Sequence, residues 1–147
     1  MAYDVGKLMG LGHNELDELF SSLPPGDIPD GWADGTAIVA PGTRVSPAIA
    51  KLIKSLVWQG KVFDSGRGVL RNRVLPFGLN AVAAKVYRHR SRLDGKECIV
   101  LDYSESSLVA RRIRDEIRAI APGVYLGRAC WNDRRLFHFT LDFNRKG

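Results

Sequence analysis

The sequence has few of the residues that build metal centres and disulfide frameworks. It contains two cysteines and three histidines in 147 residues, and none of them lies at CxxC or Cys/His ligand spacing. Cys98 and Cys130 lie inside strand-like runs, where a reduced cysteine is usually a small buried hydrophobe. His13 and His89 have no second ligand at metal spacing. The sequence therefore predicts no metal, no cofactor and no disulfide.

Long apolar runs are also missing. Residues 1–12 lack the basic lead and the apolar stretch of a signal peptide, and no run approaches the about 18 apolar residues of a membrane-spanning helix. The chain has no internal repeat and no low-complexity tract. These absences predict a single soluble domain, residues 1–147, in the cytoplasm.

Charge is distributed unevenly along the chain. Residues 1–35 contain one basic and seven acidic residues, whereas residues 36–147 contain 21 basic and nine acidic residues. Such asymmetry indicates either an anionic partner for the basic body or an acidic lead segment that lies across a basic surface. We favour the second interpretation, with residues 1–35 as the lead segment and residues 36–147 as the body.

Three segments have helical signals. Residues 14–23 place acids in the first turn and Leu and Phe at helical spacing, and Pro24-Pro25-Gly26 ends the pattern. Ser46-Pro47 is a typical helix start for a segment that runs to about residue 56. Residues 107–121 combine apolar residues at helical spacing with intervening arginines. The sequence therefore predicts two or three short helices.

The rest of the body has a period of two, which is typical of strands. Ser-Gly, Pro-Phe-Gly, Asp-Gly and Asn-Asp turn signals separate most of the alternating segments, and the connections are too short for crossover helices. The fold class is mainly β (α+β), a curled antiparallel sheet or lipocalin-like barrel of about seven to eight strands. The expected strands are 36–40, 58–64, 69–75, 81–90, 97–103, 124–131 and 136–143.

Turn chemistry predicts which side chains share a face. A two-residue turn at Asp94-Gly95 would place Lys85, Tyr87 and Asp102 on one face of a hairpin. A two-residue turn at Asn132-Asp133 would place Arg128 opposite Phe137 on an otherwise apolar face.

Arg128 is the one charged misfit of that face, and a buried guanidinium needs a partner. Three interpretations stay open: a structural pair with Asp102, a ligand carboxylate or other oxyanion, and a side chain that reaches solvent.

One order of features resembles a known group. Trp-x-Gly-Lys-x-Phe at residues 58–63 is followed by Leu101-Asp102-Tyr103, by Ile113-Arg114 and then by residues 124–128, Val-Tyr-Leu-Gly-Arg. This order resembles the uncharacterised bacterial GXWXG-domain proteins and their companion domain over residues 31–143. The resemblance implies a lipocalin-like antiparallel barrel and carries no established activity.

Three functions follow as hypotheses. The first is binding of a small amphipathic acid, of the fatty or aromatic type, in a barrel pocket. Its ligand-binding residues would be Arg128, Lys85, Tyr87, Asp102, Trp58, Phe137 and Phe139.

The second hypothesis is a cofactor-independent lyase or isomerase in the same pocket. Asp102 would be the base with a pKa raised by burial, and Tyr87 or Tyr103 would be the acid.

The third is RNA or acidic-partner binding through the arginine-rich faces, and we rank it last because the acidic lead opposes it. Whether two copies pair as a homodimer stays open.

Overall fold

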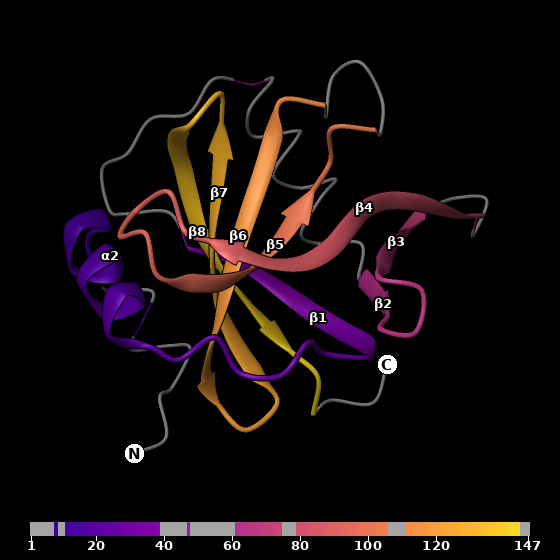
Figure 1. The fold of residues 1–147 in the computed structure, drawn as a ribbon, viewed down its shortest axis with the longest axis horizontal. Helices are drawn as coiled ribbons and strands as arrows, with labels where there is room; N and C mark the ends of the chain where they lie inside the picture. Colours follow the sequence, from indigo (N-terminus) through magenta and orange to yellow (C-terminus); the bar gives the residue numbers. More distant parts are fainter. Residues whose placement is uncertain are drawn as a thin grey trace.

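The structure is a computed structural model of the chain, and it describes Leu8, Pro47 and residues 11–38, 61–74, 79–105 and 111–144. At residues 61, 72–74 and 79–83 it describes the backbone alone. One helix and eight strands lie in these ranges (Figure 1): α2 (His13–Ser22), β1 (Gly31–Ile38), β2 (Lys61–Asp64), β3 (Val69–Val74), β4 (Leu79–Arg90), β5 (Glu97–Asp102), β6 (Ile113–Ala121), β7 (Val124–Trp131) and β8 (Arg134–Asp142).

The eight strands form a closed antiparallel barrel in which each strand pairs with its sequence neighbours. β1 closes the barrel: its first residues pair with β2, and its remaining residues, from Asp34 to Ile38, pair with β8. Closure removes the sheet edges that would otherwise expose unpaired backbone groups. The predicted fold class, a lipocalin-like barrel that is mainly β, is confirmed.

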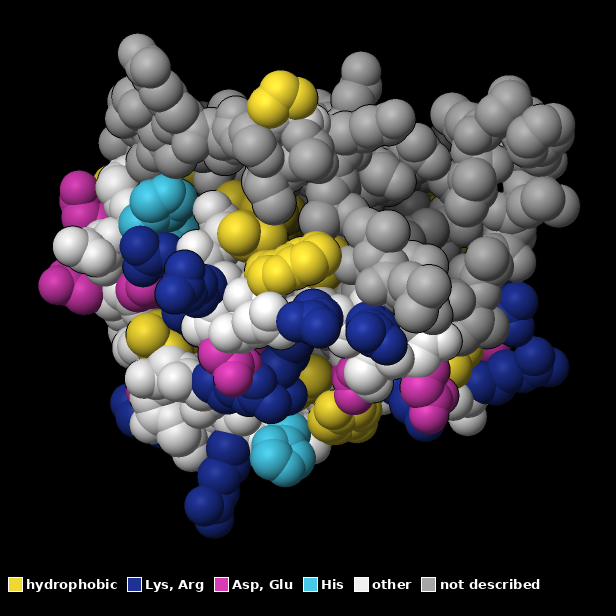
Figure 2. Space-filling view, turned by 90° about the horizontal axis from the view of Figure 1, so that it is seen from above, with side chains coloured by type: hydrophobic (Ala, Val, Ile, Leu, Met, Phe, Trp, Pro, Cys, Tyr) yellow, Lys and Arg dark blue, Asp and Glu magenta, His cyan; other side chains and the backbone are white. Residues whose placement is uncertain are grey.

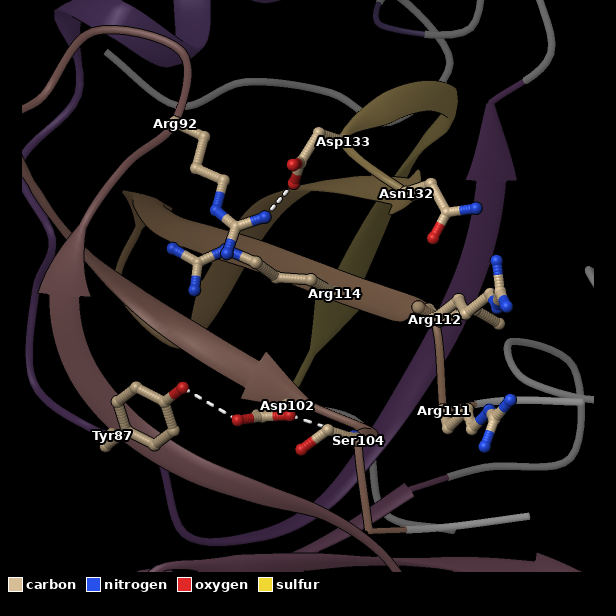
Figure 3. A pocket seen from close by; sticks show the side chains of 10 residues that line it. Tyr87, Arg92, Asp102, Ser104, Arg111, Arg112, Arg114, Asn132 and Asp133 are labelled. Carbon is tan, nitrogen blue, oxygen red and sulfur yellow. Dashed lines mark hydrogen bonds and ion pairs between the residues drawn. The ribbon is translucent and has the colours of Figure 1, made fainter. Parts of the chain in front are cut away.

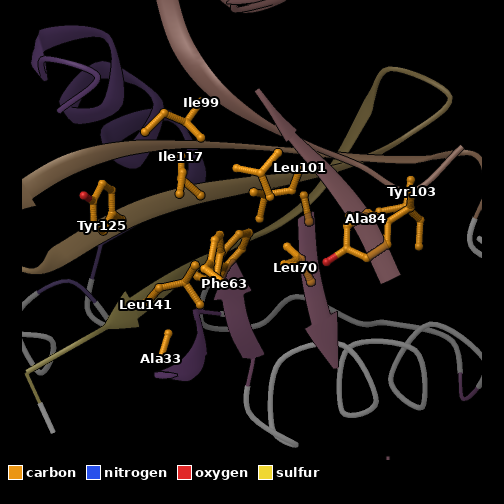
Figure 4. Packing of buried hydrophobic residues seen from close by; sticks show 14 of the residues in the cluster. Ala33, Phe63, Leu70, Ala84, Ile99, Leu101, Tyr103, Ile117, Tyr125 and Leu141 are labelled. Atoms are coloured by element: carbon orange, nitrogen blue, oxygen red, sulfur yellow. The ribbon is translucent and has the colours of Figure 1, made fainter. Parts of the chain in front are cut away.

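Apolar side chains fill much of the barrel interior (Figure 4). Phe63, Leu101, Ile117 and Leu141 each expose at most 2% of their surface and come from four different strands. An eight-stranded barrel is just wide enough for its interior to be filled by side chains or to hold one small ligand. At Gly127 the ring of Phe139 occupies the space that a side chain would need, because a Cβ atom there would lie only 2.2 Å from Cζ of Phe139. The interior therefore depends on a residue without a side chain at that point of β7.

Helix α2 covers part of the outside of the barrel (Figure 1). Leu16 and Phe20 of the helix are fully buried in a second apolar cluster, with outward-facing residues of the strands. These strand residues are Ile38, Cys98, Val100, Ile120 and Leu126. The helix predicted at residues 14–23 is thus confirmed as α2, and Leu23 follows its last residue. The described part of the chain contains no helix long and apolar enough to cross a membrane.

The prediction of a basic helix at residues 107–121 is wrong for the part of that segment that the structure describes. Residues 113–121 form β6, with Ile113 and Ile117 facing the interior and Arg118 facing outward. Residues four apart lie on one face of a helix and also on one face of a strand, so Ile113 and Ile117 fit both periods. Pairing along both β5 and β7 then decides the conformation.

Other boundaries differ in smaller ways. The strand expected at 36–40 begins at Gly31, because its first residues pair with β2. The helix expected at 46–56 lies outside the described residues except for Pro47, which is helical. Residues 58–60 of the expected strand 58–64 also lie outside them, and β2 covers the remainder.

The Asp94-Gly95 hairpin has a longer loop than predicted. Ser91 and Lys96 close it, Arg90 pairs with Glu97, and Gly95 has a φ of 73°. The register therefore moves by two residues from the predicted one. Because a shift of two preserves facing, Lys85, Tyr87 and Asp102 still share one face.

The second hairpin has the predicted two-residue turn and then a bulge. Asn132 and Asp133 both have positive φ, and Trp131 pairs with Arg134. The register shifts by one residue between Ala129 and Cys130, so that Arg128 pairs with His138. Phe137 and Phe139 of β8 face the interior as expected, whereas Arg128 and Leu126 of β7 consequently face the opposite side from the one predicted.

Candidate functional site

Arg128 does not face the barrel interior, and that prediction is wrong. It shares the outer face of β7 with Leu126, while Phe137 and Phe139 of the paired strand point inward. The bulge in the β7–β8 pair is the reason, because it exchanges the two faces. The guanidinium is buried beneath helix α2, so it does not reach solvent either.

The partners of Arg128 are carboxylates other than Asp102. Its Nε donates to Asp17 of α2 at 2.9 Å, and its Nη1 lies 3.5 Å from Glu116 of β6. Asp17 also accepts from Arg135 and lies 2.7 Å from Nε2 of His138. Asp17 of α2 thus contacts three basic side chains of β7 and β8, and Arg128 serves the docking of α2.

The predicted aromatic residues separate from the predicted polar ones. Phe137, Phe139 and Tyr103 are buried in the interior, and burial raises the pKa of Tyr103 well above its ordinary value. Asp102 lies on the outer side of β5, opposite in facing to Tyr103. The interior also contains a charged residue that the sequence did not indicate, Asp115, which alternates with Ile113 and Ile117.

Tyr87 and Asp102 instead line a hollow outside the barrel core (Figure 3). The hollow has a volume of about 330 Å³ and lies where β5 ends, β6 begins and the β7–β8 turn approaches. Four arginines and two aspartates contribute to its lining. The full set is Tyr87, Arg92, Asp102, Ser104, Arg111, Arg112, Ile113, Arg114, Asn132 and Asp133.

Two of the four arginines are held in place by carboxylates. Arg92 pairs with Asp133 across the hollow's edge (Figure 3). Arg114 donates to Glu116 at 3.1 Å and to the carbonyl oxygen of Arg90 at 3.0 Å. Glu116 is itself almost fully buried and also accepts from the hydroxyl of Ser91 at 2.6 Å. These contacts fix one wall of the hollow before any ligand arrives.

The other two arginines, Arg111 and Arg112, are exposed and adjacent in sequence. Within the ranges that the structure describes, neither guanidinium pairs with a carboxylate, although both line the hollow (Figure 3). Their charge is therefore available to a ligand in a way that the charges of Arg92 and Arg114 are not.

Tyr87 and Asp102 form a hydrogen-bonded pair on the wall that lies across the hollow from Arg92 and Asp133 (Figure 3). The hydroxyl of Tyr87 donates to Asp102 Oδ2 at 2.8 Å, and the backbone N–H of Ser104 donates to Oδ1 at 2.9 Å. Partial burial acts to raise the pKa of Asp102, but the bonds from Ser104 and Tyr87 and the charge of Arg114 hold that pKa below its ordinary value. The predicted rise in the pKa of Asp102 is therefore wrong.

Burial and the bond to Asp102 raise the pKa of Tyr87. A carboxylate of lowered pKa is a weak base, and a phenol of raised pKa is a weak acid. The pair is thus better suited to accepting a hydrogen bond from a ligand than to moving a proton. Lys85 does not join this pair, because its Nζ forms an ion pair with Glu105 at 3.0 Å.

Of the remaining candidates, Trp58 lies outside the described residues. The thiols of Cys98 and Cys130 are buried, and burial raises their pKa to about 12 and about 11, so neither is an activated nucleophile. No group of three metal-ligating side chains occurs among the residues that the structure describes.

Sequence reasoning missed most of the hollow's lining. Arg111 and Arg112 were assigned to the surface of a helix, and Asn132 and Asp133 were interpreted only as turn residues. The available signal was the adjacent arginine pair directly before a strand, close in chain order to Asp102.

Comparisons with known proteins support the fold alone. A crystal structure of a protein from Thermomonospora curvata is similar to this chain, with a TM-score of 0.65 and 19% sequence identity, over 96% of each chain. No family model matches the chain, and a search of curated proteins found no match.

Proposed function

We propose that this protein binds a small organic acid in the hollow beside Tyr87 and Asp102, with Arg111 and Arg112 as the anion-recognising groups. One observation supports this above all. Two adjacent guanidinium groups without a carboxylate partner, among the described residues, line a polar hollow whose opposite wall is already hydrogen-bonded.

Arginine is well suited to this role. Its planar guanidinium presents several N–H donors in a fixed fork that matches the oxygens of a carboxylate or phosphate. The lining carries four arginines against two aspartates, so its net positive charge attracts an acid. A volume of about 330 Å³ is at the small end of ligand sites, which favours a compact ligand over a long fatty chain.

The proposal keeps an acid as the ligand, but it replaces the fatty or aromatic type expected from the sequence by a compact polar acid and changes the anchor. An acid end beside Arg128 is not proposed again, because Asp17 and Glu116 already occupy that guanidinium. The ring of Tyr87 and the side chain of Ile113 provide the apolar surface of the hollow. We also propose that the protein is related to the GXWXG-domain proteins and that it is cytoplasmic, where a soluble metabolite would be its ligand.

Binding of RNA through the arginine faces has less support. Arg88 pairs with Glu97 at 3.4 Å, and Arg92 pairs with Asp133. On the face shown in Figure 2, acidic side chains lie between the basic ones, so the described part of that face presents no continuous basic stripe. A nucleic-acid backbone needs such a stripe, whereas a small anion needs a local pair.

Removing the two arginines is expected to abolish most of the anion affinity. In Arg111→Ala/Arg112→Ala the affinity for inorganic phosphate and citrate, measured by isothermal titration calorimetry, should fall at least about tenfold, because charge-assisted hydrogen bonds are lost.

The matched control is Arg88→Ala/Arg134→Ala, which removes the same charge from exposed positions outside the hollow's lining. Its affinity should stay within about twofold of the wild type. Equal losses in both double variants would show that general charge, not this hollow, governs binding, and the proposal would then be wrong.

A further inference from the structure

We infer that the ligand of this hollow carries a hydrogen-bond donor, a hydroxyl or an ammonium group, at the end opposite its acid group. The inference rests on the proposed function and specifies the ligand class further. It starts from the carboxylate of Asp102, which lines the same hollow as Arg111 and Arg112 (Figure 3).

Asp102 has acceptor capacity left for a ligand. An ionised carboxylate only accepts hydrogen bonds, and its two oxygens offer about four lone-pair sites. The hydroxyl of Tyr87 and the backbone N–H of Ser104 each bond to one oxygen, and the hydroxyl of Ser104 also hydrogen-bonds to this carboxylate, which leaves about one of the four sites. Those bonds also fix the carboxylate's orientation, so a further donor would meet an acceptor that is already in place.

Asp102 also differs from the other aspartate of the hollow. Asp133 is neutralised by Arg92, whereas Asp102 has no ion-pair partner within the part of the chain that the structure describes. The hollow therefore has two different ends: guanidinium groups without a carboxylate partner among the described residues at Arg111 and Arg112, and a carboxylate that Arg114 influences but does not pair with at Asp102.

This arrangement selects against a plain acid. An acid group near Asp102 would meet a like charge, so it must lie toward Arg111 and Arg112. The group that then reaches Asp102 is favourable only if it donates a hydrogen bond. Sugar phosphates, hydroxy acids and amino phosphates share this chemistry, whereas simple alkyl acids lack it.

Three probes of similar size test the inference: ethyl phosphate, glycerol 3-phosphate and O-phosphoethanolamine. The wild type should bind at least one of the two donor-bearing probes several-fold more tightly than ethyl phosphate. In Asp102→Asn the affinity for that probe should fall about tenfold, while the affinity for ethyl phosphate should rise, because a like charge has been removed. Whether the glycerol or the ethanolamine probe responds more identifies the donor.

The control is Asp64→Asn, which makes the same charge change on β2, outside the hollow's lining. It should raise or leave unchanged all three affinities alike. Thermal unfolding of Asp102→Asn checks its fold, and Asp102→Ser repeats the test with a second side chain.

The outcomes separate the inference from the proposed function. If Asp102→Asn strengthens all three probes equally, the donor requirement is wrong and the acid site stands. If no probe binds the wild type, both are wrong.

Discussion

Replacing Arg118 by leucine is expected to lower the free energy of unfolding by about 3–5 kcal/mol, the cost of removing one partner of a buried ion pair. Arg118 is fully buried on the outer face of β6. Its two terminal nitrogens donate to both oxygens of Asp94, at 2.7 and 2.9 Å, and hold the pKa of that carboxyl at about 2. Leucine would leave the largely buried carboxylate of Asp94 without its guanidinium partner, with the nearby charge of Lys96 as a weaker substitute.

The same guanidinium ties three parts of the chain together. It donates to the backbone carbonyl of Phe20 in α2 at 2.9 Å and to those of Lys96 and Glu97 at 3.1 and 3.2 Å. Its Cζ also lies 4.5 Å from the ring centroid of Phe20. Lysine cannot reproduce this set, so Arg118→Lys should recover only part of the loss.

Urea unfolding would measure these changes, with Arg134→Ala as the control. Arg134 is exposed, and its removal should change stability by less than about 0.5 kcal/mol. If Arg118→Leu were equally mild, the buried network would contribute little, and packing alone would hold α2 to the barrel.

Lowering the pH from 7 to about 4 is expected to remove on the order of 3 kcal/mol of stability through His138. Burial lowers the pKa of His138 to about 4, although the hydrogen bond to Asp17 acts in the opposite direction. In the unfolded chain histidine has a pKa of about 6.5, so between these values the unfolded state binds more protons. Stability therefore falls as the pH drops through this window and levels off for this group below it.

The surroundings of His138 explain why protonation of its ring destabilises the folded state. Its ring lies against His13, with the two Nδ1 atoms 3.3 Å apart, and it shares Asp17 with Arg128 and Arg135. A carboxylate can only accept, so Nε2 of the neutral ring carries the hydrogen that Asp17 receives. A second proton would place a further cation beside two arginines.

His138→Gln keeps a donor for Asp17 and removes the titration. Its unfolding free energy should change with pH about 2–3 kcal/mol less than that of the wild type between pH 7 and 4.5. His89→Gln, at an exposed position, should retain the wild-type slope. A slope that is unchanged in His138→Gln would place the titrating group elsewhere.

The strand framework could be predicted from local chemistry. Turn residues marked most of the hairpins, and the positive φ values at Asn132 and Asp133 explain why that turn signal was reliable. Facing on the β4–β5 hairpin was also correct, because the longer loop moved the register by two residues. These features depend on residues close together in the chain.

Features that depend on distant contacts could not be predicted in the same way. The spacing of Ile113 and Ile117 suits both a helix and a strand, and only pairing with β5 and β7 selects the strand. The bulge near Cys130 has no local signal, and it reversed the facing of Arg128. An apolar outer face beneath α2 then made the wrong register look consistent, because both faces of β7 are buried.

The candidate site illustrates the same limit. Tyr87 and Asp102 were predicted to share a face, and the structure joins them by a hydrogen bond. Their neighbours Arg111 and Arg112 follow β5 in the chain and precede β6, so their place beside Asp102 depended on recognising β6 as a strand. Assigning that segment to a helix removed them from consideration as ligand-binding residues.

The central claim is that Arg111 and Arg112 receive an anion, and the most direct measurement is an NMR titration of the arginine Nε–Hε signals with inorganic phosphate. The signals of Arg111 and Arg112 should shift along one saturable curve, while those of Arg88, Arg90 and Arg134 should shift little and without saturation. Equal, unsaturated shifts at all five arginines would contradict the claim.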